Sequence, residues 1–355
     1  MFSRIAPTLS RTARAAAPRG YATAASSSSS SSAPYFLGAG LAGAGAFWYS
    51  TKDQRALHAD ASAKDTAKSG GSVQGVKTTE DGGIKVQGES ALSPDEFRAF
   101  EIAEIRPYNH NTSTFVFKLP DGTSSGLTVA SALVCKAAAE GEGLNDKGKP
   151  IIRPYTPVTA PDVEGKLELI VKHYKGGAFT EYLFGRKVGD KIAFKGPIPK
   201  HAWKPDEFES VAFIVGGSGV TPAWQVLQAI DANPNDKTKA TLIFANVTEE
   251  DILLRKEFED LQRRKPDQFR AVFVLDKPPS GWKGPTGYVN KELITKELKQ
   301  FGTGPEGGDK VKVFVCGPPG QMKAISGAKK SPKDQGPLEG VLKELGYTES
   351  QVYKF

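Results

Sequence analysis

Short runs in which apolar and polar residues alternate occupy the chain between Phe97 and Trp203. The clearest runs are EIAEI, STFVFKL, LELIVKHY and DKIAFKG, and they are separated by the turn signals Asp121-Gly122, Gly176-Gly177 and Gly196-Pro197. A period of two is typical of strands with one buried face, and several short strands between turns predict an antiparallel β-barrel. We therefore expect an all-β domain over residues 93–205.

A different pattern begins after Pro205. VAFIVGG, ATLIFANV, RAVFVLD and VKVFVCG are continuous apolar runs, which are typical of parallel strands buried on both faces. The stretches AWQVLQAI, EEDILLRKEFEDLQRRK and NKELITKELKQF lie between them and have helical periodicity. Alternation of buried strands with helices predicts a doubly wound α/β domain with a parallel sheet over residues 206–355.

The first 92 residues lack both patterns and divide into three segments. Residues 1–32 combine Arg, Ala and Ser without an acid and end in seven serines. This composition is typical of a mitochondrial presequence, and a disordered basic tail is the alternative. The uncharged stretch YFLGAGLAGAGAFWY predicts a single membrane anchor over residues 33–51, or a sorting signal that is later removed. Residues 52–92 are polar and indicate a linker.

Composition and charge exclude several kinds of site. Of the formal net charge of +7, residues 1–52 carry +5 and the remaining 303 residues only +2, which is not the composition of a nucleic-acid-binding protein. The two cysteines and four histidines are scattered and share no ligand spacing. Neither a disulfide framework nor a zinc or iron–sulfur site is therefore expected. Redox chemistry in this chain would need an organic cofactor.

The segment RPYTPVT, residues 153–159, combines an arginine, a tyrosine and two threonines with two prolines. Because proline donates no ladder hydrogen bond, Pro154 and Pro157 place the segment at the edge of a sheet. One interpretation is an edge strand that is protected against aggregation. The other is a ligand wall, in which Arg153, Tyr155 and Thr156 face a flat, anionic group.

The α/β domain contains a glycine-rich loop directly after its first apolar run. Gly216-Gly217-Ser218-Gly219 is followed by Thr221-Pro222 and a helical stretch. Glycines allow close approach of a ligand, and the helix start offers free amides to an anion. A tight turn without a ligand is the alternative, because the spacing matches neither the usual dinucleotide motif nor a Walker loop.

Two further segments carry candidate chemistry. Cys316-Gly317-Pro318-Pro319 follows the last long apolar run, and ligands of open parallel sheets bind at the carboxyl ends of the strands. A small core residue is the alternative for Cys316. In the barrel, Gly176-Gly177 and Thr180 precede a short helical stretch and predict a second phosphate cradle, to which Arg153 would add a bidentate charge. Two such cradles suggest two nucleotides that meet between the domains.

These motifs occur in an order that matches a known family. RPYTPV, VKHYKGGAFT, GDKIAFKGP, GGSGVTP and CGPP together resemble the ferredoxin reductase-like flavoenzymes. Within that family the chain is most similar to the NADH-cytochrome b5 reductases, through HNTSTFVFKLP, ANVTEEDILLRKEFEDL and the ending YKF. The N-terminal segments and SPKDQG resemble the fungal mitochondrial form. The resemblance covers residues 97–355.

The resemblance implies a role for each matching residue. Residues on the FAD side would be Arg153 at the pyrophosphate, then Pro154, Tyr155, Thr156, Tyr174, Gly176, Gly177 and Thr180, with Lys172 near the nicotinamide nucleotide. Residues on the NADH side would be Gly216, Gly217, Ser218, Gly219, Thr221, Pro222, Asp276, Cys316, Gly317, Pro318, Met322 and Phe355. Those closest to the reacting atoms would be Thr156, Thr221 and Cys316.

The chain also departs from the family pattern. Ser218 replaces a threonine, Gly320 stands where a third proline is common, and GLTVASALVCKA lacks the Gln-His of many relatives. Asp276 would repel a 2′-phosphate and favours NADH over NADPH, whereas Lys277 and Lys283 argue in the other direction.

The implied activity is transfer of a hydride from NADH to FAD, followed by single-electron transfer to a haem acceptor such as cytochrome b5. The alternatives are an NADPH-linked ferredoxin-type reductase and a non-catalytic, membrane-anchored nucleotide-binding protein. Between Lys166 and Lys204, nine Lys/Arg face only three acids. This excess predicts either a solvated surface or a docking face for an acidic haem protein. The resemblance also implies a single-pass protein of the outer mitochondrial membrane, alone or together with a soluble intermembrane-space form.

Overall fold

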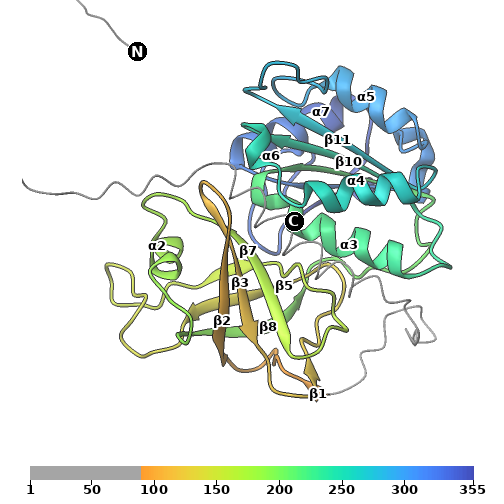
Figure 1. Cartoon of the computed structure of the whole chain (residues 1–355). Coiled ribbons are helices and arrows are strands. Elements are labelled where there is room, and N and C mark those ends of the chain that lie inside the picture. Colours follow the sequence, from red (N-terminus) through yellow and green to blue (C-terminus); the bar gives the residue numbers. More distant parts are fainter. Residues whose placement is uncertain (1–88) are drawn as a thin grey trace, which may run out of the picture. The chain divides into compact units, whose positions relative to one another are not determined.

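The computed structural model describes residues 89–355 (Figure 1). The predicted presequence, the anchor and almost all of the linker lie outside this range. Within it, no helix combines the length and the apolar character that crossing a membrane requires.

The first domain is a six-stranded antiparallel sheet with the strand order β6-β5-β8-β2-β3-β7. Its strands are β2 (Arg98–Asn109), β3 (Thr112–Lys118), β5 (Ser131–Ala137), β6 (Arg153–Tyr155), β7 (Lys166–Lys172) and β8 (Lys191–Pro199). Helix α2 (Ala178–Phe184) connects β7 to β8, and the short strands β1 (Glu89–Ser90) and β4 (Thr123–Ser124) form a separate parallel pair.

The sheet closes on itself through the segment that opens with RPY. Strand β6 is an edge strand, paired only with β5, as its prolines predict. Beyond it, the Val158 amide donates to the Glu168 carbonyl of β7, the other edge strand, at 3.0 Å. The two edges therefore meet across residues 156–159, and the sheet encloses an apolar core that includes Phe115, Phe117 and Phe194.

The second domain is a five-stranded parallel sheet with the order β11-β10-β9-β12-β13. Its strands are β9 (Ser210–Gly216), β10 (Lys239–Asn246), β11 (Phe269–Leu275), β12 (Val311–Cys316) and β13 (Val352–Lys354). Its α-helices are α3 (Thr221–Ala232), α4 (Arg255–Arg264), α5 (Lys291–Lys299), α6 (Pro319–Ser326) and α7 (Gly340–Glu344). Short 3-10 helices are η1 (Gly217–Val220), η2 (Glu249–Asp251), η3 (Pro305–Lys310) and η4 (Glu349–Gln351).

Helices cover both faces of this sheet, as its continuous apolar strands predict (Figure 1). Alternate residues of β9 point to opposite sides, with Phe213 packed among residues of α3 and α4 and Ile214 among residues of α5, α6 and α7. The doubly wound arrangement is therefore confirmed.

The structure corrects two local predictions. The stretch EEDILLRKEFEDLQRRK is not one helix, because Leu254 adopts a left-handed backbone conformation (φ 55°) and separates η2 from α4. A left-handed residue cannot continue a right-handed helix. Gly196-Pro197 does not end a strand either, since β8 continues through it to Pro199, with a register shift opposite on β5 between Ala132 and Val134.

Candidate functional site

The carboxyl ends of the parallel strands bring the candidate residues of the second domain to one edge of the sheet. Gly216 ends β9, Cys316 ends the neighbouring β12, and Phe355 directly follows β13. Asp276 follows β11, two strands away from β9. Because strands lie about 4.8 Å apart, this places Asp276 about 10 Å from the glycine loop along the sheet. Open parallel sheets bind their ligands at this edge.

The glycine loop lies directly against the Cys316 loop. A Cβ atom on Gly219 would lie 2.7 Å from the Cys316 carbonyl oxygen and 3.0 Å from the Gly317 nitrogen. At Gly216 it would lie 2.9 Å from Cδ of Pro318. Gly217 has a φ of 52°, a left-handed backbone conformation that glycine adopts more readily than other residues. The two motifs therefore form one continuous surface that excludes larger side chains.

Helix α3 starts immediately after this loop. Thr221 is its first residue, and the hydroxyl donates to the Ser218 carbonyl at 3.3 Å. Pro222 follows in the first turn, where its missing amide hydrogen costs no helical hydrogen bond. The Thr221 amide donates to the Ser218 carbonyl as well, and the dipole of α3 favours an anionic ligand near this end of the helix.

Cys316 and Phe355 are neighbours at the sheet edge. The Phe355 amide donates to the Val315 carbonyl at 3.0 Å, and its ring stacks on Phe314 with centroids 5.5 Å apart. Burial raises the pKa of the Cys316 thiol to about 11, against a smaller opposing effect of the Lys329 ammonium. The thiol is therefore neutral at physiological pH, which suits a residue that shapes a pocket rather than a nucleophile.

Met322 is mostly buried. It lies on α6, is 8% exposed, and packs in the core among residues such as Val315 and Ile325. The family resemblance places it on the NADH side. In the structure it packs against the apolar core on the α5–α7 side of the sheet.

In the barrel, the RPY strand presents an arginine without an acidic partner. The Arg153 side chain is exposed, forms no ion pair within the described part of the chain, and donates only to the carbonyl of its neighbour Ile152, at 2.9 Å. Pro154 is exposed beside it, whereas Tyr155 and Thr156 are half-buried. The Tyr155 ring lies 5.9 Å from that of Phe179 on α2, and burial raises the pKa of its hydroxyl. An exposed guanidinium next to a fixed aromatic ring suits a ligand with a phosphate and a flat ring system.

The loop from Tyr174 to Thr180 folds tightly on itself. The Thr180 hydroxyl donates to the carbonyls of Gly177, at 3.0 Å, and Tyr174, at 3.2 Å. A Cβ atom on Gly177 would lie 2.6 Å from that hydroxyl, and Gly176 has a φ of 75°. Both glycines are therefore required by the turn, and Thr180 holds the loop in shape.

The two cradles touch each other. Tyr174 is 53% exposed, and its hydroxyl lies 3.4 Å from the Ser218 hydroxyl of the glycine loop. A ligand on the barrel wall and a ligand on the sheet edge would therefore meet beside this pair. The predicted convergence of the two motifs is present in the structure.

Lys172 forms an ion pair that the sequence did not indicate. Its ammonium lies 3.0 Å from a carboxylate oxygen of Asp251, in the second domain, which is only 6% exposed. Burial alone would raise the pKa of Asp251, but hydrogen bonds from Lys172 and Thr248 lower it below its ordinary value. Nearby, the Leu254 amide donates to the Tyr108 hydroxyl at 2.7 Å. The β2–β3 hairpin and β7 are thereby attached to the η2 loop.

Helix α3 also holds the barrel wall. The Gln225 amide group donates to the Pro157 carbonyl at 3.0 Å and accepts from the Ser131 amide at 3.1 Å. The Trp224 indole donates to the Val158 carbonyl at 3.2 Å. In the sequence, these contacts are indicated only by Gln225, a polar residue among the mostly apolar residues of AWQVLQAI.

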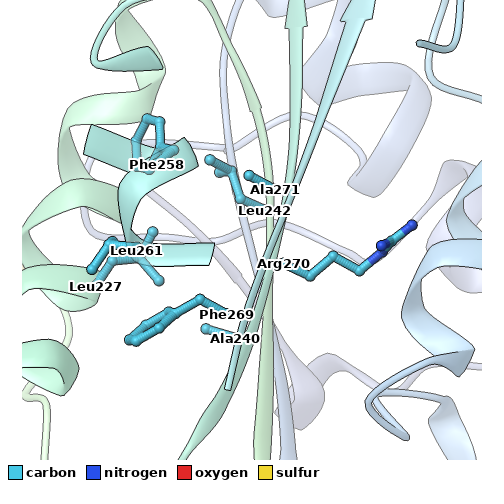
Figure 2. Close-up of a pocket in the computed structure, with 8 residues that line it drawn as sticks. All are labelled: Leu227, Ala240, Leu242, Phe258, Leu261, Phe269, Arg270 and Ala271. Atoms are coloured by element: carbon cyan, nitrogen blue, oxygen red, sulfur yellow. The ribbon is translucent and has the colours of Figure 1, made fainter. Parts of the chain in front are cut away.

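The cavity shown in Figure 2 is not a ligand site. It lies between α3, α4 and the strands β10 and β11, is lined mainly by apolar side chains, and has a volume of about 10 Å³. This is the lower limit for a single water molecule. The polar Arg270 points to the other face of the sheet, where its guanidinium donates to Glu297 at 2.8 Å.

Comparison with known proteins identifies both domains. Residues 99–203 match the model of the oxidoreductase FAD-binding domain, and residues 213–327 match that of the oxidoreductase NAD-binding domain. The NADH-cytochrome b5 reductase 2 of Mycosarcoma maydis is 53% identical over 267 residues, which are 75% of this chain and 74% of that protein. That of Coccidioides immitis is 43% identical over 97% of this chain and 98% of its own length. The chain belongs to the NADH-cytochrome b5 reductase family.

Among solved structures, the cytochrome b5 reductase domain of Ulva prolifera nitrate reductase superposes with a TM-score of 0.64. It is 29% identical and covers 75% of this chain and 100% of that domain. This reductase is accordingly an FAD-dependent, NADH-oxidising enzyme. The residues described above fit both groups, because an unpaired arginine and a fixed tyrosine line the barrel wall and a glycine cradle opens at the sheet edge.

Proposed function

We propose that this reductase transfers a hydride from NADH at the sheet edge to FAD on the barrel wall, and passes electrons singly to a cytochrome b5-type haem protein. The observation that carries this proposal is the 3.4 Å approach of Tyr174 and Ser218, which makes the two cradles adjacent. NADH releases two electrons together and a haem accepts one, and bound FAD supplies the conversion between them.

The side chains at this site bind and orient, and no general base is required. Arg153 would pair with the FAD pyrophosphate, because its guanidinium presents parallel donors that match phosphate oxygens. Tyr155 and Thr156 would border the flavin ring. Thr221 and Cys316 would position the nicotinamide from the sheet side, and the neutral thiol would add no charge beside the transferred hydride.

Asp276 supports NADH as the donor. Its carboxylate is exposed at the end of β11 and forms no ion pair within residues 89–355, which leaves it available to accept hydrogen bonds from ribose hydroxyls. The same charge would repel the 2′-phosphate of NADPH. Comparing initial rates with NADH and NADPH tests this choice, and a preference for NADPH would favour a ferredoxin-type reductase instead.

Arg153→Ala tests the flavin side of the site. We expect the purified variant to retain less FAD than the wild type, by absorbance, because a charge-assisted phosphate contact is lost, while its affinity for NAD⁺ stays within about twofold. Arg263→Ala, at an exposed arginine of α4, is the control and should keep its FAD. Full FAD retention with normal turnover in Arg153→Ala would show that the RPY strand is only a protected edge.

The docking proposal centres on one turn of the barrel, in which exposed lysines adjoin an exposed apolar residue. Three of the basic residues between positions 166 and 204 form ion pairs with acidic side chains, namely Lys166, Lys172 and Arg186. Lys187 and Lys191 are exposed, make no side-chain ion pair among the described residues, and flank Val188, which is 56% exposed. The same turn contains Asp190, which accepts from the Lys187 amide at 2.9 Å and lies 4.0 Å from the Arg186 guanidinium. Three basic residues against one acid, beside an exposed apolar residue, fit an acidic protein surface.

Charge reversal tests this turn. We expect Lys187→Glu/Lys191→Glu to slow reduction of a cytochrome b5 at low salt while ferricyanide reduction is unchanged, because steering depends on the charge of the partner. Lys299→Glu on α5, another exposed lysine, should slow neither reaction. Equal slowing of both acceptors by the double variant would contradict a docking role.

The N-terminal part of the proposal is insertion in the outer mitochondrial membrane through residues 33–51, preceded by a presequence in residues 1–32. Its support is the basic, acid-free composition of the start and the uncharged stretch that follows. Alkaline carbonate extraction of isolated mitochondria tests the anchor. Full-length protein should stay with the membrane pellet, whereas a chain lacking residues 33–51 should be released.

A further inference from the structure

One helix contacts both sides of the proposed reaction site. Helix α3 begins at Thr221, directly after the glycine loop, and its side chains three and four positions later reach the barrel. There, Trp224 and Gln225 hydrogen-bond to Val158 and Pro157, which directly follow Tyr155 and Thr156. The backbone that carries the nicotinamide cradle and the backbone that carries the flavin wall are therefore linked through one turn of helix.

Gln225 has the geometry of a fixed spacer. Its side chain is 6% exposed, and both ends of its amide are bound to backbone groups of the barrel, Pro157 on one side and Ser131 on the other. Breaking these bonds would leave buried donors and acceptors without partners, so the glutamine is held in one position. Val158 is fixed in turn by its bond to Glu168, which closes the barrel.

These hydrogen bonds limit how far residues 155–158 of the barrel can move relative to the glycine loop Gly216–Gly219. A further link between the barrel and the glycine loop is the 3.4 Å contact between the hydroxyls of Ser218 and Tyr174, and Tyr174 is 53% exposed. Hydride transfer depends steeply on donor–acceptor separation, and a misplacement of about 1 Å is able to cost about 100-fold in rate. Gln225 is buried, lies on a helix and makes two hydrogen bonds to the barrel backbone, and a side chain of this kind is suited to hold that separation.

We propose that Gln225 is a positioning residue that sets the distance between the nicotinamide and the flavin by fixing residues 155–158 to α3. The proposal rests on the function proposed above and adds a residue that touches neither ligand. Trp224 contributes a weaker, parallel contact through its indole.

The test compares Gln225→Leu with Gln228→Leu. Both change a glutamine of α3 to a residue of similar volume, but Gln228 makes no hydrogen bond to the barrel in the described structure. We expect Gln225→Leu to retain FAD and to bind NAD⁺ within about twofold of the wild type, while NADH reduces its flavin at least about tenfold more slowly in stopped flow. The primary deuterium isotope effect on that step should rise, and amides of residues 153–159 should exchange faster with deuterium.

Trp224→Phe is the second variant, because it loses the bond to Val158 but keeps an aromatic ring against Phe258. A smaller slowing with the same isotope signature supports the proposal, even where Gln225→Leu fails to fold. Unchanged flavin reduction in the folded variants overturns it. Slowing that only tracks lost FAD or a lower melting temperature also overturns it, because that result indicates a purely structural role. If NADH does not reduce the flavin of the wild type, the proposed function itself is wrong.

Discussion

Gly219→Ala tests the contact between the glycine loop and the Cys316 loop. The added Cβ would lie 2.7 Å from the Cys316 carbonyl oxygen and 2.8 Å from its carbonyl carbon. Ordinary contact begins near 3.4 Å, so one loop must move by about 0.7 Å. Both atoms belong to the backbone, and no side-chain rotation relieves the overlap.

Overpacking of this kind costs about 1–3 kcal/mol. Because the loops together form the proposed nucleotide cradle, we expect this energy to appear mainly as weaker nucleotide binding. It corresponds to an increase of about 5- to 150-fold in the NAD⁺ dissociation constant. Calorimetric titration of the oxidised protein with NAD⁺ measures it, and the flavin absorbance should stay unchanged because the barrel wall is not altered.

Gly320→Ala is the matched control in the same region. A Cβ atom there meets nothing within 4 Å, and the residue lies inside α6 without a positive φ. Alanine should therefore leave binding unchanged and stabilise the fold by about 0.4–1 kcal/mol. The reasoning is refuted if Gly219→Ala binds NAD⁺ as tightly as Gly320→Ala and melts at the same temperature.

The pKa shifts lead to further predictions. Asp251→Asn should lower the free energy of unfolding at pH 7 by about 1–3 kcal/mol, because the buried ion pair with Lys172 is lost. Since the pKa of Asp251 is lowered in the folded protein, this difference from the wild type should be full above about pH 4 and shrink as the pH falls further, in urea titrations. Burial, aided by Lys312, lowers the pKa of His201 to about 4 from 6.5. The melting temperature of the wild type should therefore fall from pH 6.5 toward pH 4 more steeply than that of His201→Phe. The same dependence of melting temperature on pH in both proteins would contradict this expectation.

Most of the fold was predictable because it follows from local patterns. Alternating and continuous apolar runs distinguished the antiparallel barrel from the parallel sheet, and proline in RPY predicted an edge strand, which β6 is. The local errors occurred where backbone conformation departs from side-chain periodicity. Leu254 takes a left-handed conformation within an apparently helical run, and β8 runs through a Gly-Pro pair that usually marks a turn.

The sequence alone determined which segments are the candidates for the site. Glycines and prolines at Gly216–Gly219 and Gly317–Pro319 encode backbone geometry locally, and parallel strands necessarily deliver the loops that follow them to one edge. Only the tertiary structure decided the contacts between the domains, such as Lys172 with Asp251 and Gln225 with Pro157. These residues lie 79 and 68 positions apart, and no local pattern specifies which side chains meet when two separately folded cores pack together. For the same reason Met322, so close to Cys316 in sequence, lies in the core: the rotation of α6 about its axis is set by the sheet beneath it.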